Sequence, residues 1–136
     1  MQLTPLITVH LAAALAGTAV GPIALWARRR GAARPRLHRI AGYSWVLLML
    51  VTALSAVFIR DYKLPNLAGY TPIHLLVPAL LGGLTLAFWR LARHDIAGHR
   101  RAMRITYLGA CLVAGAFTLL PSRYLGGLLW HGLLGL

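Results

Sequence analysis

The sequence predicts an all-α membrane protein, an antiparallel bundle of four transmembrane helices, and three features support this fold class. Of the 136 residues, 59% are hydrophobic and only 12% are charged, whereas about a quarter of the residues in a soluble domain are charged. Four apolar stretches reach the roughly 20 residues that a helix needs to cross a bilayer. Arginines separate these stretches instead of forming one basic face, so the net charge of +12 does not indicate a nucleic-acid partner.

The apolar stretches give the four helices in chain order. They cover about Leu3–Ala27, Ile40–Ile59, Pro72–Ala92 and Met103–Leu120. None alternates polar and apolar residues like a barrel strand, and helices are the only other way to satisfy the backbone in lipid. Short connections make neighbouring helices antiparallel. Pro35 and Pro72 suit the first turn of a helix, and Asp95 suits the N-cap of the fourth helix.

The chain divides into a bundle, residues 1–120, and a tail, residues 121–136. The bundle consists of two helical hairpins, about residues 3–59 and 72–120. The tail, "PSRYLGGLLWHGLLGL", is too short to cross the bilayer, and we expect it to lie as an amphipathic segment on the outer surface.

The distribution of basic residues sets the orientation. The two turns that join helices one to two and three to four hold Arg28, Arg29, Arg30, Arg34, Arg36 and Arg39, and then Arg90, Arg93, Arg100, Arg101 and Arg104. The opposite side holds Arg60, Lys63 and Arg123. The positive-inside rule therefore places both arginine-rich turns in the cytoplasm and both termini outside, in a bacterial inner membrane.

The two halves of the bundle share a series of landmarks. The first half reads "HLAAALAGTAVGPIALWARRR" from His10 and reaches "HR" at His38–Arg39. The second reads "HLLVPALLGGLTLAFWRLAR" from His74 and reaches "HR" at His99–Arg100. Each half has a tryptophan near the end of its first helix, before the arginines. This agreement predicts a repeated helical hairpin.

Such a repeat pairs the histidines. Two parallel copies pack around a pseudo-two-fold axis along the membrane normal, so His10 faces His74 near the outer surface and His38 faces His99 near the inner surface. An ionisable residue inside a membrane is a candidate functional residue. Zinc needs three or four protein ligands, whereas haem iron takes only its axial ligands from the protein. The sequence therefore predicts two b-type haems with bis-His ligation, one near each membrane face.

Other residues fit the same interpretation. Arg39 and Arg100, next to the inner histidines, are candidates to bind haem propionates, and the outer candidates are Arg60, Lys63 and Arg123. Gly17 and Gly82 lie two turns after His10 and His74 and would leave room for a flat ring. Close helix packing explains these glycines equally well. Two haems would form an electron path across the bilayer, linked to a quinone or another small-molecule donor or acceptor.

The pattern resembles two families. The four histidines, one on each helix and paired between alternate helices, resemble the di-haem core of the cytochrome b561 family, over about residues 3 to 120, which implies transmembrane electron transfer. That family usually has six helices, and its ascorbate-site residues have no counterparts here. The chain also resembles a family of small bacterial membrane proteins of unknown function, on the early histidine of the first helix, "HRIAGY" from His38 and "HRRAMRITY" from His99.

Several alternatives stay open. His94 could replace His99 as the inner ligand. The same histidines could serve a membrane protein that handles copper or another metal ion, although the methionines do not cluster as copper sites usually require. The chain could also be a cofactor-free structural or accessory subunit. The sequence allows both an oxidoreductase and a homodimer.

Overall fold

The computed structural model describes residues 3–28, 34–62 and 65–136. Arg29, Arg30 and Lys63, which the sequence analysis assigned to topology or haem binding, lie outside these ranges. The helices in chain order are α1 (Pro5–Trp26), α2 (Pro35–Phe58), η1 (Pro72–Leu75), α3 (Leu76–Ala92), α4 (Ile96–Tyr107), η2 (Leu108–Val113), α5 (Ala114–Thr118), α6 (Tyr124–Gly127) and η3 (Leu128–Leu133). In the described ranges, extended pairing is limited to one bridge between Leu67 and Tyr70, so the all-α prediction is confirmed.

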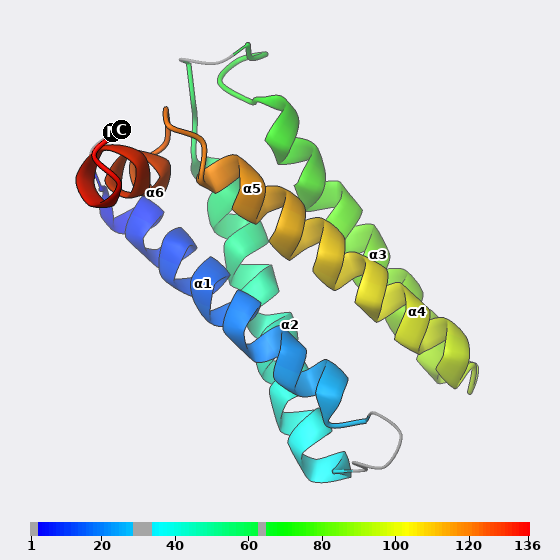
Figure 1. Cartoon of the computed structure of the whole chain (residues 1–136). Coiled ribbons are helices and arrows are strands. Elements are labelled where there is room, and N and C mark those ends of the chain that lie inside the picture. The colour runs from blue at the N-terminus through cyan, green and yellow to red at the C-terminus, as the bar shows by residue number, and fades with distance from the viewer. Residues whose placement is uncertain (1–2, 29–33, 63–64) are drawn as a thin grey trace.

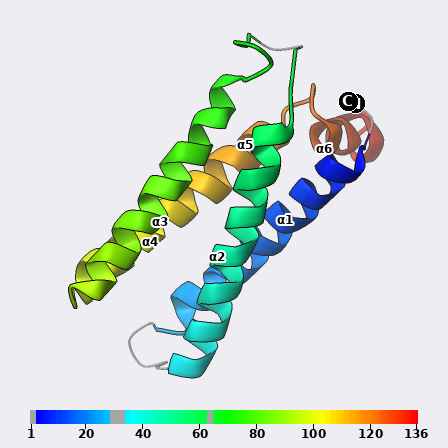
Figure 2. The ribbon, with the colours of Figure 1, turned by 180° about the vertical axis from the view of Figure 1, so that it is seen from behind.

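Two helical hairpins make up the molecule. Helix α1 packs along α2, helix α3 packs along α4, and the hairpins meet mainly where α2 contacts α3 and α1 contacts η2. Both termini and the α2–α3 loop lie at one end, here called the termini end (Figure 1). The ends of α1 and α3 and the starts of α2 and α4 lie at the other, here called the arginine end. Seen from both sides, the hairpins diverge toward the arginine end (Figures 1 and 2).

Local capping explains where α2 and α4 begin. Pro35 is the first residue of α2, where its missing N–H costs nothing. The Asp95 carboxylate accepts a hydrogen bond from the Gly98 N–H at 2.8 Å, which confirms it as the N-cap of α4. Both helices therefore begin before the apolar stretches, since their polar first turns are also helical. As a result, His38 and His99 are each the fourth residue of their helix.

Three segments are long and apolar enough to cross a membrane: Pro5–Trp26, Pro35–Phe58 and Pro72–Ala92. The fourth expected span corresponds to α4, η2 and α5, which follow one another without a break from Ile96 to Thr118. Its first half carries three arginines, and η2 is a π-helical turn in its middle. Large apolar side chains are exposed along all the long helices, as expected for helices whose surroundings are lipid.

The buried core lies where the two hairpins meet. Its centre consists of Trp45 and Met49 from α2, Leu80 and Leu84 from α3, and Cys111 from η2. The core thus holds α2 against the second hairpin near the middle of the molecule. Along the bundle, His10 and His74 lie on one side of the core and His38 and His99 on the other.

Candidate functional site

His10 projects from α1 toward α2. Its Nδ1 lies 3.0 Å from the Thr52 carbonyl oxygen and 2.9 Å from Ser55 Oγ. A carbonyl oxygen can only accept a hydrogen bond, so Nδ1 carries a proton, and in the neutral ring Nε2 keeps its lone pair. Among the described residues, none makes a hydrogen bond to this Nε2. Sequence analysis missed Thr52 and Ser55, although two hydroxyl residues three apart in an apolar helix could have indicated a buried polar partner.

His38 and His99 make the same bond, one in each hairpin. His38 Nδ1 donates to the carbonyl oxygen of Ala24 at 2.8 Å, and His99 Nδ1 donates to that of Ala87 at 2.8 Å. Each acceptor belongs to the first helix of the hairpin, two residues before its tryptophan. In the neutral ring, each Nε2 is then the nitrogen that carries a lone pair. A metal-binding histidine commonly has this arrangement, in which the second ring nitrogen donates to a carbonyl and fixes the ring.

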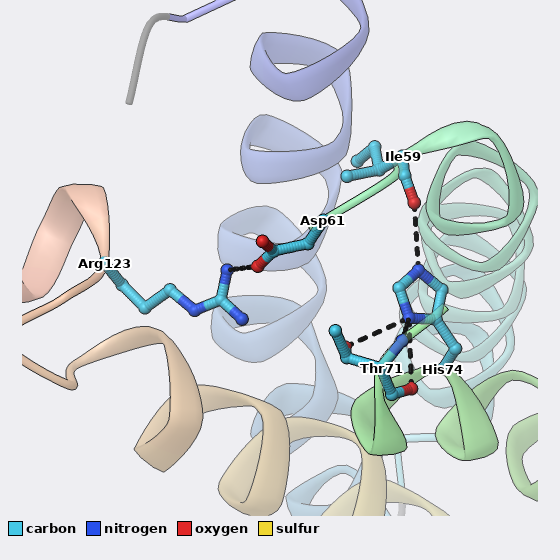
Figure 3. Close-up of polar contacts among 5 residues, drawn as sticks. All are labelled: Ile59, Asp61, Thr71, His74 and Arg123. Atoms are coloured by element: carbon cyan, nitrogen blue, oxygen red, sulfur yellow. Dashed lines mark hydrogen bonds and ion pairs between the residues drawn. The ribbon is translucent and has the colours of Figure 1, made fainter. Parts of the chain in front are cut away.

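His74 is bound differently. Its Nε2 donates to the carbonyl oxygen of Ile59 at 3.0 Å, and its Nδ1 accepts from the N–H of Thr71 at 3.1 Å (Figure 3). Both ring nitrogens are thus used, and the ring joins the end of α2 to the first turn of η1. The stretch Thr71–His74 forms a capping box, a motif visible in the sequence "TPIH". His74 can bind a metal through Nε2 only after releasing Ile59.

A cavity of about 380 Å³ opens at the termini end, and both His10 and His74 line it. Its walls are mainly aliphatic side chains from α1, α2, α3 and the η2–α5 segment. The polar residues of the lining include the two histidines, Thr52 and Thr71. They also include an ion pair, in which Arg123 Nη1 lies 2.6 Å from Asp61 Oδ2. An apolar pocket of this size with a few convergent polar groups is typical of a small-molecule or cofactor site.

The two predicted histidine pairs differ in their surroundings. His10 and His74 both line the cavity at the termini end. His38 and His99 are each bonded within their own hairpin, and the hairpins diverge at this end (Figure 2). Arg39 and Arg100 are exposed beside them.

The two glycines expected beneath a haem differ from each other. A side chain at Gly17 would collide with Met49 of α2, so this glycine allows α1 and α2 to pack closely. Gly82 has open space where its side chain would be. The close-packing alternative therefore accounts for Gly17, whereas no residue in the described ranges lies within 4 Å of the place where a side chain at Gly82 would begin.

Asp95 and the two remaining histidines, His94 and His131, lie at the surface. His94 is exposed in the α3–α4 turn with a left-handed backbone, φ 58°, and His131 bonds the Leu136 carbonyl oxygen in the tail. Asp95 also pairs with Arg90 at 2.8 Å. The Gly98 N–H, and then Arg90, hold the pKa of the Asp95 carboxyl below its ordinary value. No three His, Cys, Asp or Glu side chains of the described ranges gather as a metal site.

Comparison with known proteins places the chain in a family. Searches of curated proteins and of solved structures found no match. A family model described as "Predicted membrane protein (DUF2306)" matches residues 7–124, a range that includes His10, His38, His74 and His99. The expected resemblance to a membrane-protein family of unknown function is thereby confirmed. Since the match covers most of its length, the chain belongs to the DUF2306 family of predicted membrane proteins.

Proposed function

We propose that the protein is a transmembrane electron-transfer protein that holds two b-type haems, one near each membrane face, as in the cytochrome b561 plan. One observation carries this proposal: the Nδ1–H groups of His10, His38 and His99 are all bonded to backbone carbonyls, and their Nε2 atoms are left available. Three histidines bonded in the same way, at two levels of one bundle, would supply three of the four axial ligands that two bis-His haems require, and His74 would supply the fourth.

The proposal includes a fourth membrane span and an orientation. The segment Ile96–Thr118 has 23 residues by its bounds, or about 35 Å of helix at 1.5 Å per residue, which is enough to cross a bilayer. The described arginines at the arginine end outnumber Arg60 and Arg123 at the termini end. The positive-inside rule then makes the arginine end cytoplasmic and the termini end outer.

The residues at the outer level fit a haem in most respects. The cavity is apolar, has the volume of a ligand site, and contains His10 with an available Nε2. His74 fits if its Nε2 exchanges the Ile59 carbonyl for iron. When bound, haem would supply an iron centre that accepts and releases one electron. The protein would hold that iron, orient the ring through Thr52 and Ser55, and exclude water.

At the inner level, the ring nitrogens of His38 and His99 suit haem iron. The proposal includes a separation between these two histidines that lets one haem lie between them. His38 and His99 occupy equivalent positions in the two hairpins, each tied to a buried alanine carbonyl. A haem between them would join the hairpins where they diverge. Arg39 and Arg100, one residue further along, would meet its propionates.

Single-histidine variants test the two-site arrangement. In haem-replete cells, His10→Ala should lose one of the two haems and keep the inner one, whereas His38→Ala should do the reverse. His131→Ala is the matched control, since this histidine lies in the tail, and it should keep both. Reduced spectra and the haem-to-protein ratio of each purified variant give the result. Loss of one and the same chromophore from both His10→Ala and His38→Ala, while the control keeps both haems, would contradict the proposal.

A further inference from the structure

An ion pair between Asp61 and Arg123 lines the outer cavity. Asp61 follows α2 and Arg123 precedes α6, so the contact joins parts of the chain 62 residues apart (Figure 3). Their side chains are only 12% and 14% exposed. The guanidinium also lies over the ring of Phe117, 4.3 Å from its centre. All three residues line the cavity that contains His10.

The Arg123 guanidinium has a donor left over. Its Nε is buried and makes no hydrogen bond to any described residue. A buried N–H without an acceptor costs free energy, and native proteins rarely keep one without a water, an ion or a ligand to satisfy it. The planar guanidinium presents its N–H groups in a fork that matches the two oxygens of a carboxylate. Arg123 also lines the cavity, so a carboxylate of whatever fills the cavity would meet the guanidinium there, and a turn of the side chain would bring that carboxylate to Nε.

The shape and chemistry of the cavity describe that ligand. Aliphatic walls suit an apolar body, and a single arginine suits an acidic edge. We propose that Arg123 binds a carboxylate of the ligand in the outer cavity, which is a haem propionate if the function proposed above is correct. Asp61 then acts as a competitor: it pairs with Arg123 in the ligand-free protein and repels a second carboxylate beside it.

This role predicts opposite effects for the two members of the ion pair. Arg123→Gln removes the donor and should weaken binding of an acidic porphyrin. Asp61→Asn keeps Arg123, removes the competing charge and should strengthen it. A purely structural ion pair predicts something else, because either substitution breaks the same contact and both should then weaken binding.

The test is a titration of the haem-free protein in detergent with haemin and with haemin dimethyl ester, which has no free carboxylates. A His38→Ala, His99→Ala background confines binding to the outer cavity. Arg123→Gln should weaken haemin binding roughly 10- to 100-fold, the effect of losing a charged hydrogen bond, and should leave ester binding unchanged. Arg93→Gln is the matched control. Arg93 lies on the Trp89 ring at the arginine end, outside the cavity lining, and its loss should change haemin binding less than about twofold.

The outcomes separate this inference from the function on which it rests. Weaker haemin binding in Arg123→Gln, together with stronger binding in Asp61→Asn, supports it. Equal losses for haemin and its ester, or losses in both variants, overturn the role of Arg123 and leave the haem site intact. Failure of the background protein to bind either porphyrin overturns the proposed function together with this inference.

Discussion

Adjacent glycines in α3 offer a test of how the second hairpin packs. A side chain at Gly83 would collide with Oγ1 of Thr106, whereas one at Gly82 would meet nothing within 4 Å. Thr106 cannot easily move away, because it is buried and its hydroxyl donates to the Ala102 carbonyl at 2.7 Å. Gly83→Ala should therefore be destabilising relative to Gly82→Ala.

The magnitude follows from two terms. Replacing glycine by alanine inside a helix stabilises by about 1 kcal/mol, and both variants gain this equally. Only Gly83→Ala adds a methyl group to a filled contact, which costs about 1–3 kcal/mol. The two variants should thus differ by about 1–3 kcal/mol in free energy of unfolding, with Gly82→Ala at or above the wild type.

Cys111 supplies the assay. It is the single cysteine of the chain and lines the cavity with only 7% of its surface exposed, so a bulky maleimide dye should react with it much faster when the bundle opens. Labelling rates across a thermal or denaturant series in detergent give the stability of each variant. The double variant Gly83→Ala, Thr106→Ala removes the obstructing hydroxyl and should recover part of the loss. Equal stabilisation by both single glycine variants would refute the α3–α4 packing described here.

Three further predictions concern His74, Cys111 and Asp95. His74→Ala removes the bonds to Ile59 and Thr71, which should speed protease cleavage in the α2–α3 loop; cleavage at the wild-type rate would contradict the described role of the ring. Wild-type Cys111 should resist labelling under native conditions and react at once in a denaturing detergent, and fast native labelling would show that the core is open. The pKa of Asp95 is lowered in the folded state, so its stabilising contribution should be complete above the ordinary pKa of the carboxyl and lost as the pH falls through the lowered value. Asp95→Asn should flatten the acid limb of the stability curve, and an unchanged acid limb would count against the capping interaction.

The sequence predicted the helices well because their signals are local. The cap at Asp95 and the proline at the start of α2 depend on neighbouring residues alone, and both are confirmed. Apolar content was a poorer guide to where α2 and α4 begin, because it marks the lipid-compatible part of a helix and not its polar first turn. The π-helical turn at Leu108–Val113 had no local signal, since its hydrogen-bond register depends on packing.

The equivalence of two of the histidines could be predicted from the sequence, and the contacts of the histidines could not. The spacing of the histidines identified His38 and His99 as equivalent, and the structure gives them the same bond to equivalent alanines. The threonine three residues before His74 distinguished it from His10, but the sequence analysis did not recognise this capping box, through which His74 comes to use both ring nitrogens. The ion pair between Asp61 and Arg123 depends on how the tail folds back over the bundle, which no pattern along the chain encodes.

The central claim is most directly tested by the visible absorption spectrum of the full-length protein, purified in detergent from haem-replete cells. Spectra are recorded in the oxidised state and after reduction with dithionite, together with the haem-to-protein ratio. Bis-His ligation at both levels predicts a sharp low-spin b-type spectrum with about two haems per chain. A colourless, folded protein with Cys111 still protected from labelling would contradict the claim, and metal analysis of the same sample would then separate a metal-ion site from a cofactor-free bundle.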